Sequence, residues 1–217
     1  MWYNNIMIKN PYSGKFIAFE GLDGSGSTTQ ASKLRSFLNE SQEKFVLGRP
    51  LAHLTKEPTN NIVGGLIRGQ LTGDWKTQPE CLQLLFSADR AHHLEKEIIP
   101  LLEKGTTVIT DRYFLSTVAF GGLEVEDMEW LIEIYKPFIL PDITFLIKVS
   151  PKTCIERIKG DRFHIELFEK EESLTQVWKN YEKLAKRFEN VYIIDGERPV
   201  EEVFEEIKNM VHLKLNI

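Results

Sequence analysis

Short apolar runs separated by longer helical patterns most strongly limit how this chain can fold. The runs are of strand length, and most of their residues are β-branched or aromatic. That composition is typical of strands buried on both faces of a parallel sheet. The runs lie at Phe16–Phe19, Leu51–Leu54, Thr107–Thr110, Ile143–Val149 and Val191–Ile194.

Helical patterns fill the intervals between these runs. They cover Thr28–Asn39, Pro79–Leu102, Glu166–Phe188 and Pro199–Val211. Alternating β and α elements predict a three-layer α/β domain, with a central parallel five-stranded sheet and helices on both faces. Ligands bind such sheets beyond the carboxyl ends of the strands, so we expect the chemistry just after each run.

Composition narrows the class of protein. The 217 residues, 42% hydrophobic and 27% charged, suit one packed domain at residues 15–217 after an N-terminal extension at residues 1–14. A net charge of −5 disfavours a polymeric nucleic-acid partner. Cys81 and Cys154 form no disulfide framework, and no apolar run approaches the roughly 18 residues of a membrane span. We therefore expect a cytoplasmic protein without a membrane partner.

A glycine-rich loop follows the first run and opens the first predicted helix. It nearly matches the phosphate-binding pattern of two glycines four residues apart, then Lys and Ser/Thr. Backbone amides of such a loop converge on phosphate oxygens, and the helix dipole adds positive potential. Thr28 holds the position of the Mg²⁺-binding hydroxyl, whereas Ser27 replaces the lysine. The residues expected to bind ATP are Gly21, Leu22, Asp23, Gly24, Ser25, Gly26, Ser27, Thr28 and Thr29.

The loop and further segments together resemble thymidylate kinases. The resemblance implies the P-loop NTPase fold, one nucleoside-monophosphate kinase domain and a homodimer. It also implies transfer of the γ-phosphate of ATP to dTMP, giving dTDP for dTTP synthesis. The segments are Phe16–Gly26 with Thr29-Gln30, Thr55–Thr59, Leu85–Arg90, Asp111–Phe120, Arg157–Phe163 and Val191–Gly196.

The resemblance assigns part of the acceptor site to Thr55–Thr59 and Leu85–Arg90. Phe86 matches the phenylalanine that stacks on thymine, and Arg90 matches an arginine that contacts the monophosphate. The two are four residues apart and share one helix face. Lys56 stands in the position of an arginine that holds the same phosphate. Lysine supplies the charge without the bidentate fork.

The segment after the third run completes the implied acceptor and metal sites. Arg112 is expected to grip the acceptor phosphate, Thr117 to hydrogen-bond the thymine edge, and Phe120 to close the base pocket. Asp111 ends a buried strand, as a Walker B carboxylate does. With Thr28 it is the predicted Mg²⁺ site.

The resemblance further implies a lid at about residues 157–170. Some family members carry an arginine in the phosphate loop where this chain has Gly24. In variants without it, the transition-state arginine comes from the lid, and the candidates are Arg162 and then Arg157. Asp23 is expected to face the acceptor sugar and to help position the nucleotide. The predicted catalytic residues are therefore Asp23, Arg112, Arg162 and Arg157.

Two other functions remain open from the sequence. The acceptor can be another nucleoside monophosphate, because Thr117 alone does not exclude other pyrimidines. The chain can also be a nucleotide-binding protein with decayed catalysis, as Ser27 suggests. Activity is favoured because the other phosphate-handling positions hold suitable residues, namely Arg90, Asp111, Arg112 and Arg162.

Overall fold

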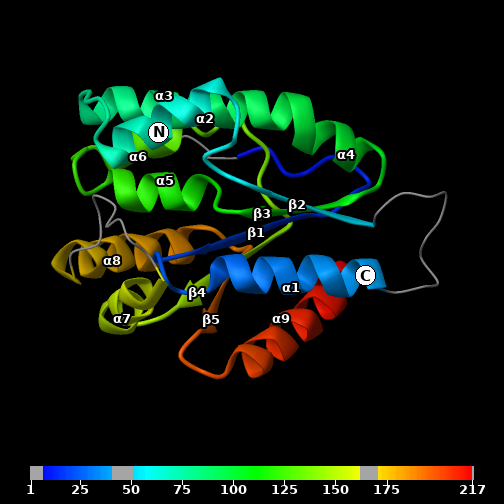
Figure 1. The fold of residues 1–217 in the computed structure, drawn as a ribbon. Helices are drawn as coiled ribbons and strands as arrows, with labels where there is room; N and C mark the ends of the chain where they lie inside the picture. Colours follow the sequence, from blue (N-terminus) through cyan, green and yellow to red (C-terminus); the bar gives the residue numbers. More distant parts are fainter. Residues whose placement is uncertain (1–6, 41–50, 162–170, 217) are drawn as a thin grey trace.

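The strands are β1 (Phe16–Gly21), β2 (Ala52–Lys56), β3 (Thr107–Asp111), β4 (Ile143–Lys148) and β5 (Val191–Asp195). The computed structural model describes residues 7–40, 51–161 and 171–216. In it the strands form one sheet in the order β2-β3-β1-β4-β5, and every neighbouring pair is parallel (Figure 1). The predicted five-stranded parallel sheet is confirmed.

The helices are α1 (Ser27–Glu40), α2 (Ile62–Thr72), α3 (Pro79–His93), α4 (Ile99–Glu103), α5 (Phe114–Gly121), α6 (Met128–Glu133), α7 (Pro151–Asp161), α8 (Glu171–Arg187) and α9 (Val200–Leu215). Figure 1 shows α3, α4 and α5 on one side of the sheet and α1 and α9 on the other. This layering confirms the predicted three-layer fold. Along the described parts of the chain, no helix combines the length and apolar character needed to cross a membrane.

The helix predicted over Pro79–Leu102 is interrupted in the structure. α3 ends at His93, and a π-helical turn, η3 (Leu94–Ile98), joins it to α4. His93 is buried at this junction, where its Nε2 lies 2.8 Å from Thr55 Oγ1 of β2. π-Turns inside helices often mark functional sites. Here the turn places a histidine beside the carboxyl end of β2.

Other helix boundaries also differ from the sequence pattern. α8 covers most of the predicted Glu166–Phe188, of which residues 166–170 lie outside the described residues. Sequence patterning predicts no helix for α2, α5, α6 or α7. α5 is only eight residues long and almost entirely apolar, so it shows no helical period. Its contacts with α3 and α8 supply the packing that its local sequence does not predict.

The described part of the predicted N-terminal extension packs against the domain. Met7 is buried in the core, and Ile8 forms an isolated parallel bridge with Ile139. Gly14 donates its amide to the carbonyl of Leu102 at 2.9 Å. Residues 7–14 therefore link the segment before β4 to the end of α4.

The strand order changes direction at β1, which lies between β3 and β4. In parallel α/β sheets, such a point opens a crevice at the carboxyl ends of the strands. The glycine-rich loop leaves β1 there, and Arg112 follows β3 directly. The topology thus brings the two most informative sequence segments to one place.

Candidate active site

The glycine-rich loop joins β1 to α1 and lines a cavity of about 500 Å³. Gly24 and Gly26 have φ angles of 80° and 93°, a region that favours glycine. A Cβ on Gly24 would lie 2.6 Å from the carbonyl oxygen of Cys154 on α7. Any side chain at position 24 would therefore meet the backbone of α7 in this conformation.

Most of the residues predicted to bind ATP line this donor cavity. Gly21 and Leu22 are not part of the lining, and the Leu22 side chain is fully buried in the core. The lining includes Asp23, Gly24, Ser25, Gly26, Ser27, Thr28 and Thr29 from the loop, and Gly196, Arg198 and Val200 from the segment after β5.

Asp111 at the end of β3 accepts hydrogen bonds from both hydroxyls at the start of α1. Ser27 Oγ lies 3.0 Å from Asp111 Oδ1, and Thr28 Oγ1 lies 2.5 Å from Oδ2. The hydroxyl and carboxylate oxygens are the ligand types that Mg²⁺ prefers, together with phosphates and water. The two residues predicted to hold Mg²⁺ are thus adjacent. No cluster of three or more His, Cys, Asp or Glu suited to a metal occurs among the described residues.

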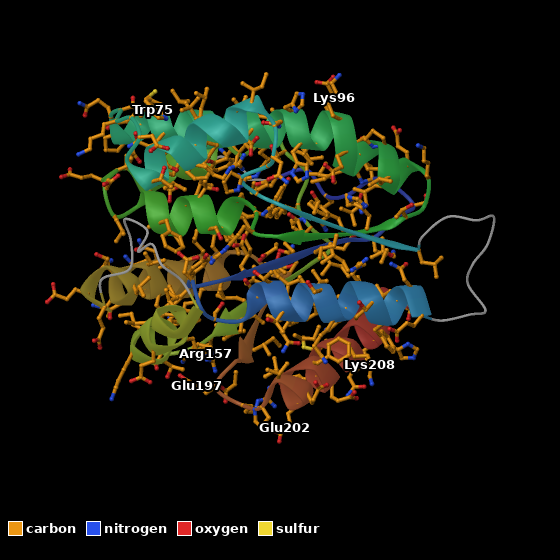
Figure 2. All side chains as sticks on the ribbon, in the orientation of Figure 1. Trp75, Lys96, Arg157, Glu197, Glu202 and Lys208 are labelled. Atoms are coloured by element: carbon orange, nitrogen blue, oxygen red, sulfur yellow. The ribbon has the colours of Figure 1, made fainter. Side chains whose placement is uncertain are left out.

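Arg157 on α7 reaches the donor cavity from the far side of the loop. Its guanidinium lies 3.4 Å from the carbonyl oxygen of Gly24 and donates to that of Gly196 at 3.2 Å. Figure 2 shows it near the loop after β5 that carries Glu197. Arg162 and most of the predicted lid lie outside the described residues.

Arg112 connects the phosphate loop to α8. Its φ of 75° is unusual for a residue other than glycine, and such strain is often found at functional sites. Its guanidinium donates to Asp23 Oδ1 at 2.7 Å and to the carbonyl oxygen of Gly21. It also lies 3.3 Å from the Tyr181 hydroxyl on α8. Gly21 at the end of β1 and Tyr181 on α8 therefore hold this arginine beside Asp23 of the phosphate loop.

Glu20 lies fully buried next to Arg112, and its importance was not predicted from the sequence. Burial raises the pKa of its carboxyl to about 7 from an ordinary value near 4.5, although hydrogen bonding to Ser116 and the charge of Arg112 oppose this. Its oxygens accept from the Tyr113 amide at 3.0 Å and from the Ser116 hydroxyl. A carboxylate inside an otherwise apolar strand was the available sequence signal.

A second cavity, of about 170 Å³, adjoins the loop between α3 and α5. The structure brings together all but one of the residues predicted for the acceptor. Lys56 is the exception: it is exposed at the end of β2 and does not line this cavity. The predicted residues that line it are Asp23, Phe86, Arg90, Arg112, Thr117 and Phe120.

Arg90 is 1% exposed and is held by the buried carboxylate of Glu57, which no local sequence pattern marks as a partner. Its Nε donates to Glu57 Oε2 at 2.8 Å, and its Nη1 donates to Thr117 Oγ1 at 3.1 Å. The guanidinium lies 4.6 Å from the ring centres of both Tyr113 and Tyr135. Arg90 is thus fixed beside the threonine predicted to read the base.

The sheet is doubly wound, a phosphate loop follows its first strand, and an aromatic cavity adjoins the loop. This is the arrangement of a P-loop nucleoside-monophosphate kinase, and the fold and site place the chain in that class. A family model described as thymidylate kinase matches residues 19–207. The chain belongs to the thymidylate kinase family, whose enzymes phosphorylate dTMP to dTDP with ATP.

Curated relatives and solved structures agree with this assignment. A probable thymidylate kinase of Thermococcus kodakarensis is 38% identical over 208 residues, covering 92% of this chain and 98% of the relative. A thymidylate kinase of Carboxydothermus hydrogenoformans is 35% identical over 207 residues, covering 91% and 97%. The structure of thymidylate kinase from Candida albicans superposes with a TM-score of 0.79 at 24% identity, covering 94% of this chain and 93% of that one.

Proposed function

We propose that this chain transfers the γ-phosphate of ATP to dTMP, with the reacting phosphates meeting beside Asp23 and Arg112. The observation that carries the proposal is that these two residues line both cavities. A donor in one cavity and an acceptor in the other would have their phosphates adjacent there. Phosphoryl transfer needs this adjacency, together with an in-line arrangement of the attacking and leaving oxygens.

On the donor side, the loop amides and the N-terminus of α1 would hold the ATP phosphates. Thr28 and Asp111 would hold Mg²⁺, which supplies charge neutralisation on the phosphate oxygens when bound. Their adjacent oxygens fit this ion. Ser27 offers no positive charge, so the nearby arginines would neutralise more of the negative charge on the ATP phosphates.

On the acceptor side, Phe86 would stack on the base, Thr117 would bond its edge, and Phe120 would close the pocket. Arg90 and Arg112 line the cavity and would bind the monophosphate, and the exposed Lys56 at the end of β2 would add positive potential from outside it. The attacking phosphate oxygen is already anionic near neutral pH, so the protein needs to supply no general base. Catalysis then rests on positioning and on charge stabilisation.

Arg112 would stabilise the charge that develops between the two phosphates, and Asp23 would hold it in place through their 2.7 Å ion pair. Arg162 is the proposed transition-state arginine of the lid, with Arg157 second. Support for Arg157 comes from its position in the lining of the donor cavity. An arginine of this kind contributes about 10³–10⁵ in rate in well-studied enzymes.

We also propose that the protein is a cytoplasmic homodimer that pairs through α2 and α3. Ile62 is 86% exposed, and Leu66 and Leu84 are also exposed on these helices. Clustered exposed apolar side chains commonly mark a protein interface. Sedimentation analysis of the chain and of a Leu66→Glu, Leu84→Glu variant tests this, because a monomeric parent would contradict it.

A coupled assay of ADP release tests the proposed reaction. We expect Mg²⁺-dependent turnover with dTMP, a lower rate with dUMP and little with purine monophosphates. Equal rates for purine and pyrimidine acceptors would overturn the assignment of dTMP. Binding of ATP and dTMP without transfer would instead support a protein with decayed catalysis.

A further inference from the structure

The carboxamide oxygen of Gln83 on α3 is buried in the wall of the acceptor cavity without a hydrogen-bond partner. The residue is 4% exposed, and its Oε1 has no partner. Buried polar groups in native proteins are nearly always paired. A missing partner in the wall of a substrate cavity points to the substrate.

The position of Gln83 on its helix fits this reading. Gln83, Phe86 and Arg90 lie three and seven residues apart, which places them on one face of α3. All three line the acceptor cavity. If Phe86 stacks on the flat face of the base, then Gln83, one turn earlier, lies at the edge of the same ring. An amide at a ring edge is suited to reading hydrogen-bonding groups.

Gly121 on α5 makes the room that this amide occupies. A Cβ on Gly121 would lie 2.8 Å from both Cδ and Oε1 of Gln83, which is closer than real atoms allow. Any larger residue at position 121 would therefore displace the carboxamide. Thr117 lies one turn before Gly121 and bonds Arg90 of α3, so the two helices meet at two polar positions along the cavity.

We propose that Gln83 is a specificity-determining residue that reads the imide edge of the acceptor base. Its oxygen accepts the N3–H of thymine, and its amide nitrogen donates to a neighbouring ring carbonyl. A 180° rotation about the last side-chain bond exchanges the two atoms, so either arrangement of the free amide can reach this pairing. The inference rests on the proposed function, because it requires dTMP in this cavity.

A direct test is nuclear magnetic resonance of the side-chain amides in the ¹⁵N-labelled parent protein. The Gln83 amide signals, assigned through bonds, are followed during titration with dTMP. Large shifts of these signals, with a hydrogen-bonded N3 proton on bound ¹⁵N-labelled dTMP, are the expected result. Unmoved Gln83 signals, while signals of other cavity residues shift, would overturn the inference. If no signals shift and dTMP is not phosphorylated, it is the proposed function that fails.

Kinetics of Gln83→Met add a second readout. Methionine preserves the length of the side chain without its polar groups, and we expect kcat/KM for dTMP to fall about 10- to 100-fold. Discrimination between dTMP and N3-methyl-dTMP should fall with it. The matched control is Gln70→Met on α2, a glutamine whose Oε1 also lacks a partner but which does not line the cavity. Equal effects of the two variants, or unchanged kcat/KM for dTMP in Gln83→Met, would contradict the proposal.

Discussion

Ser27 donates a hydrogen bond to Asp111, with 3.0 Å between Ser27 Oγ and Asp111 Oδ1. This bond ties the position where a phosphate-loop lysine is expected to the carboxylate at the end of β3. Ser27 is buried and lines the donor cavity. Its side chain therefore orders the carboxylate proposed to bind Mg²⁺ and adds no positive charge to the donor cavity.

The first prediction concerns how the missing charge is replaced. We expect Arg162→Ala to reduce turnover by about 10³-fold or more while leaving dTMP binding nearly unchanged. Ser27→Lys is expected to tighten ATP binding and to rescue part of that loss, because both changes act on the same charge. A double-mutant cycle on kcat and ATP affinity measures the coupling. Ser27→Ala, which removes the Asp111 bond without adding charge, is the control, and purely additive effects would contradict the idea.

The second prediction concerns the proposed Mg²⁺ site. Asp111→Asn keeps the shape of the side chain but removes its charge. We expect the Mg²⁺ concentration for half-maximal turnover to rise about 10- to 100-fold. Asp195→Asn at the end of β5, an exposed carboxylate outside the donor cavity, is the control and is expected to behave like the parent. Identical Mg²⁺ titrations for Asp111→Asn and the parent would show that Asp111 does not serve the metal.

Arg112 provides the third prediction. Arg112→Ala is expected to lower kcat/KM for dTMP by roughly 10- to 150-fold, the equivalent of about 1.5–3 kcal/mol for a lost charge-assisted contact. Arg112→Lys should recover only part of the lost kcat/KM for dTMP, because lysine lacks the bidentate fork. Arg187→Ala removes an arginine from a surface pair with Glu129 and should leave turnover unchanged. Normal turnover in a folded Arg112→Ala variant would contradict the proposed role.

The fourth prediction follows from the raised pKa of Glu20. Its folded pKa of about 7 lies above the unfolded value near 4.5, so the folded state binds the extra proton between these values. The free energy of unfolding therefore falls as pH rises from about 4.5 to 7, by about 3 kcal/mol in total. Glu20→Gln should lose this dependence. Urea titrations of both proteins from pH 4.5 to 8 measure it, and parallel pH profiles would mean that Glu20 has an ordinary pKa.

The fifth prediction concerns the buried pair of Glu57 and Arg90. Removing one partner leaves the other charge buried without compensation, so Glu57→Gln should lower the free energy of unfolding by about 3–5 kcal/mol. Glu129→Gln breaks an exposed pair and should cost less than about 1 kcal/mol. Urea unfolding at pH 7 measures both. Equal costs would show that the buried pair contributes no more than a surface pair.

Local sequence signals were enough to predict the fold class and the phosphate loop that lines the donor cavity. Glycines at fixed spacing, β-branched runs and a carboxylate at a strand end are read from neighbouring residues, and their physical meaning depends little on the rest of the chain. The roles expected of Arg112, Thr117 and Phe120 came instead from the resemblance of the Asp111–Phe120 segment to thymidylate kinases. The local patterns and this resemblance together predicted the class of protein without information on tertiary contacts.

Tertiary structure decided the features that join residues far apart in the sequence. Glu57 and Arg90 meet because α3 packs beside the end of β2, and Gln83 faces Gly121 because α3 packs against α5. Glu20 has a raised pKa only because the assembled sheet and helices exclude water from it. Desolvation and close packing depend on the whole fold, so a local pattern such as the carboxylate within β1 marks a position without giving its contacts or its pKa.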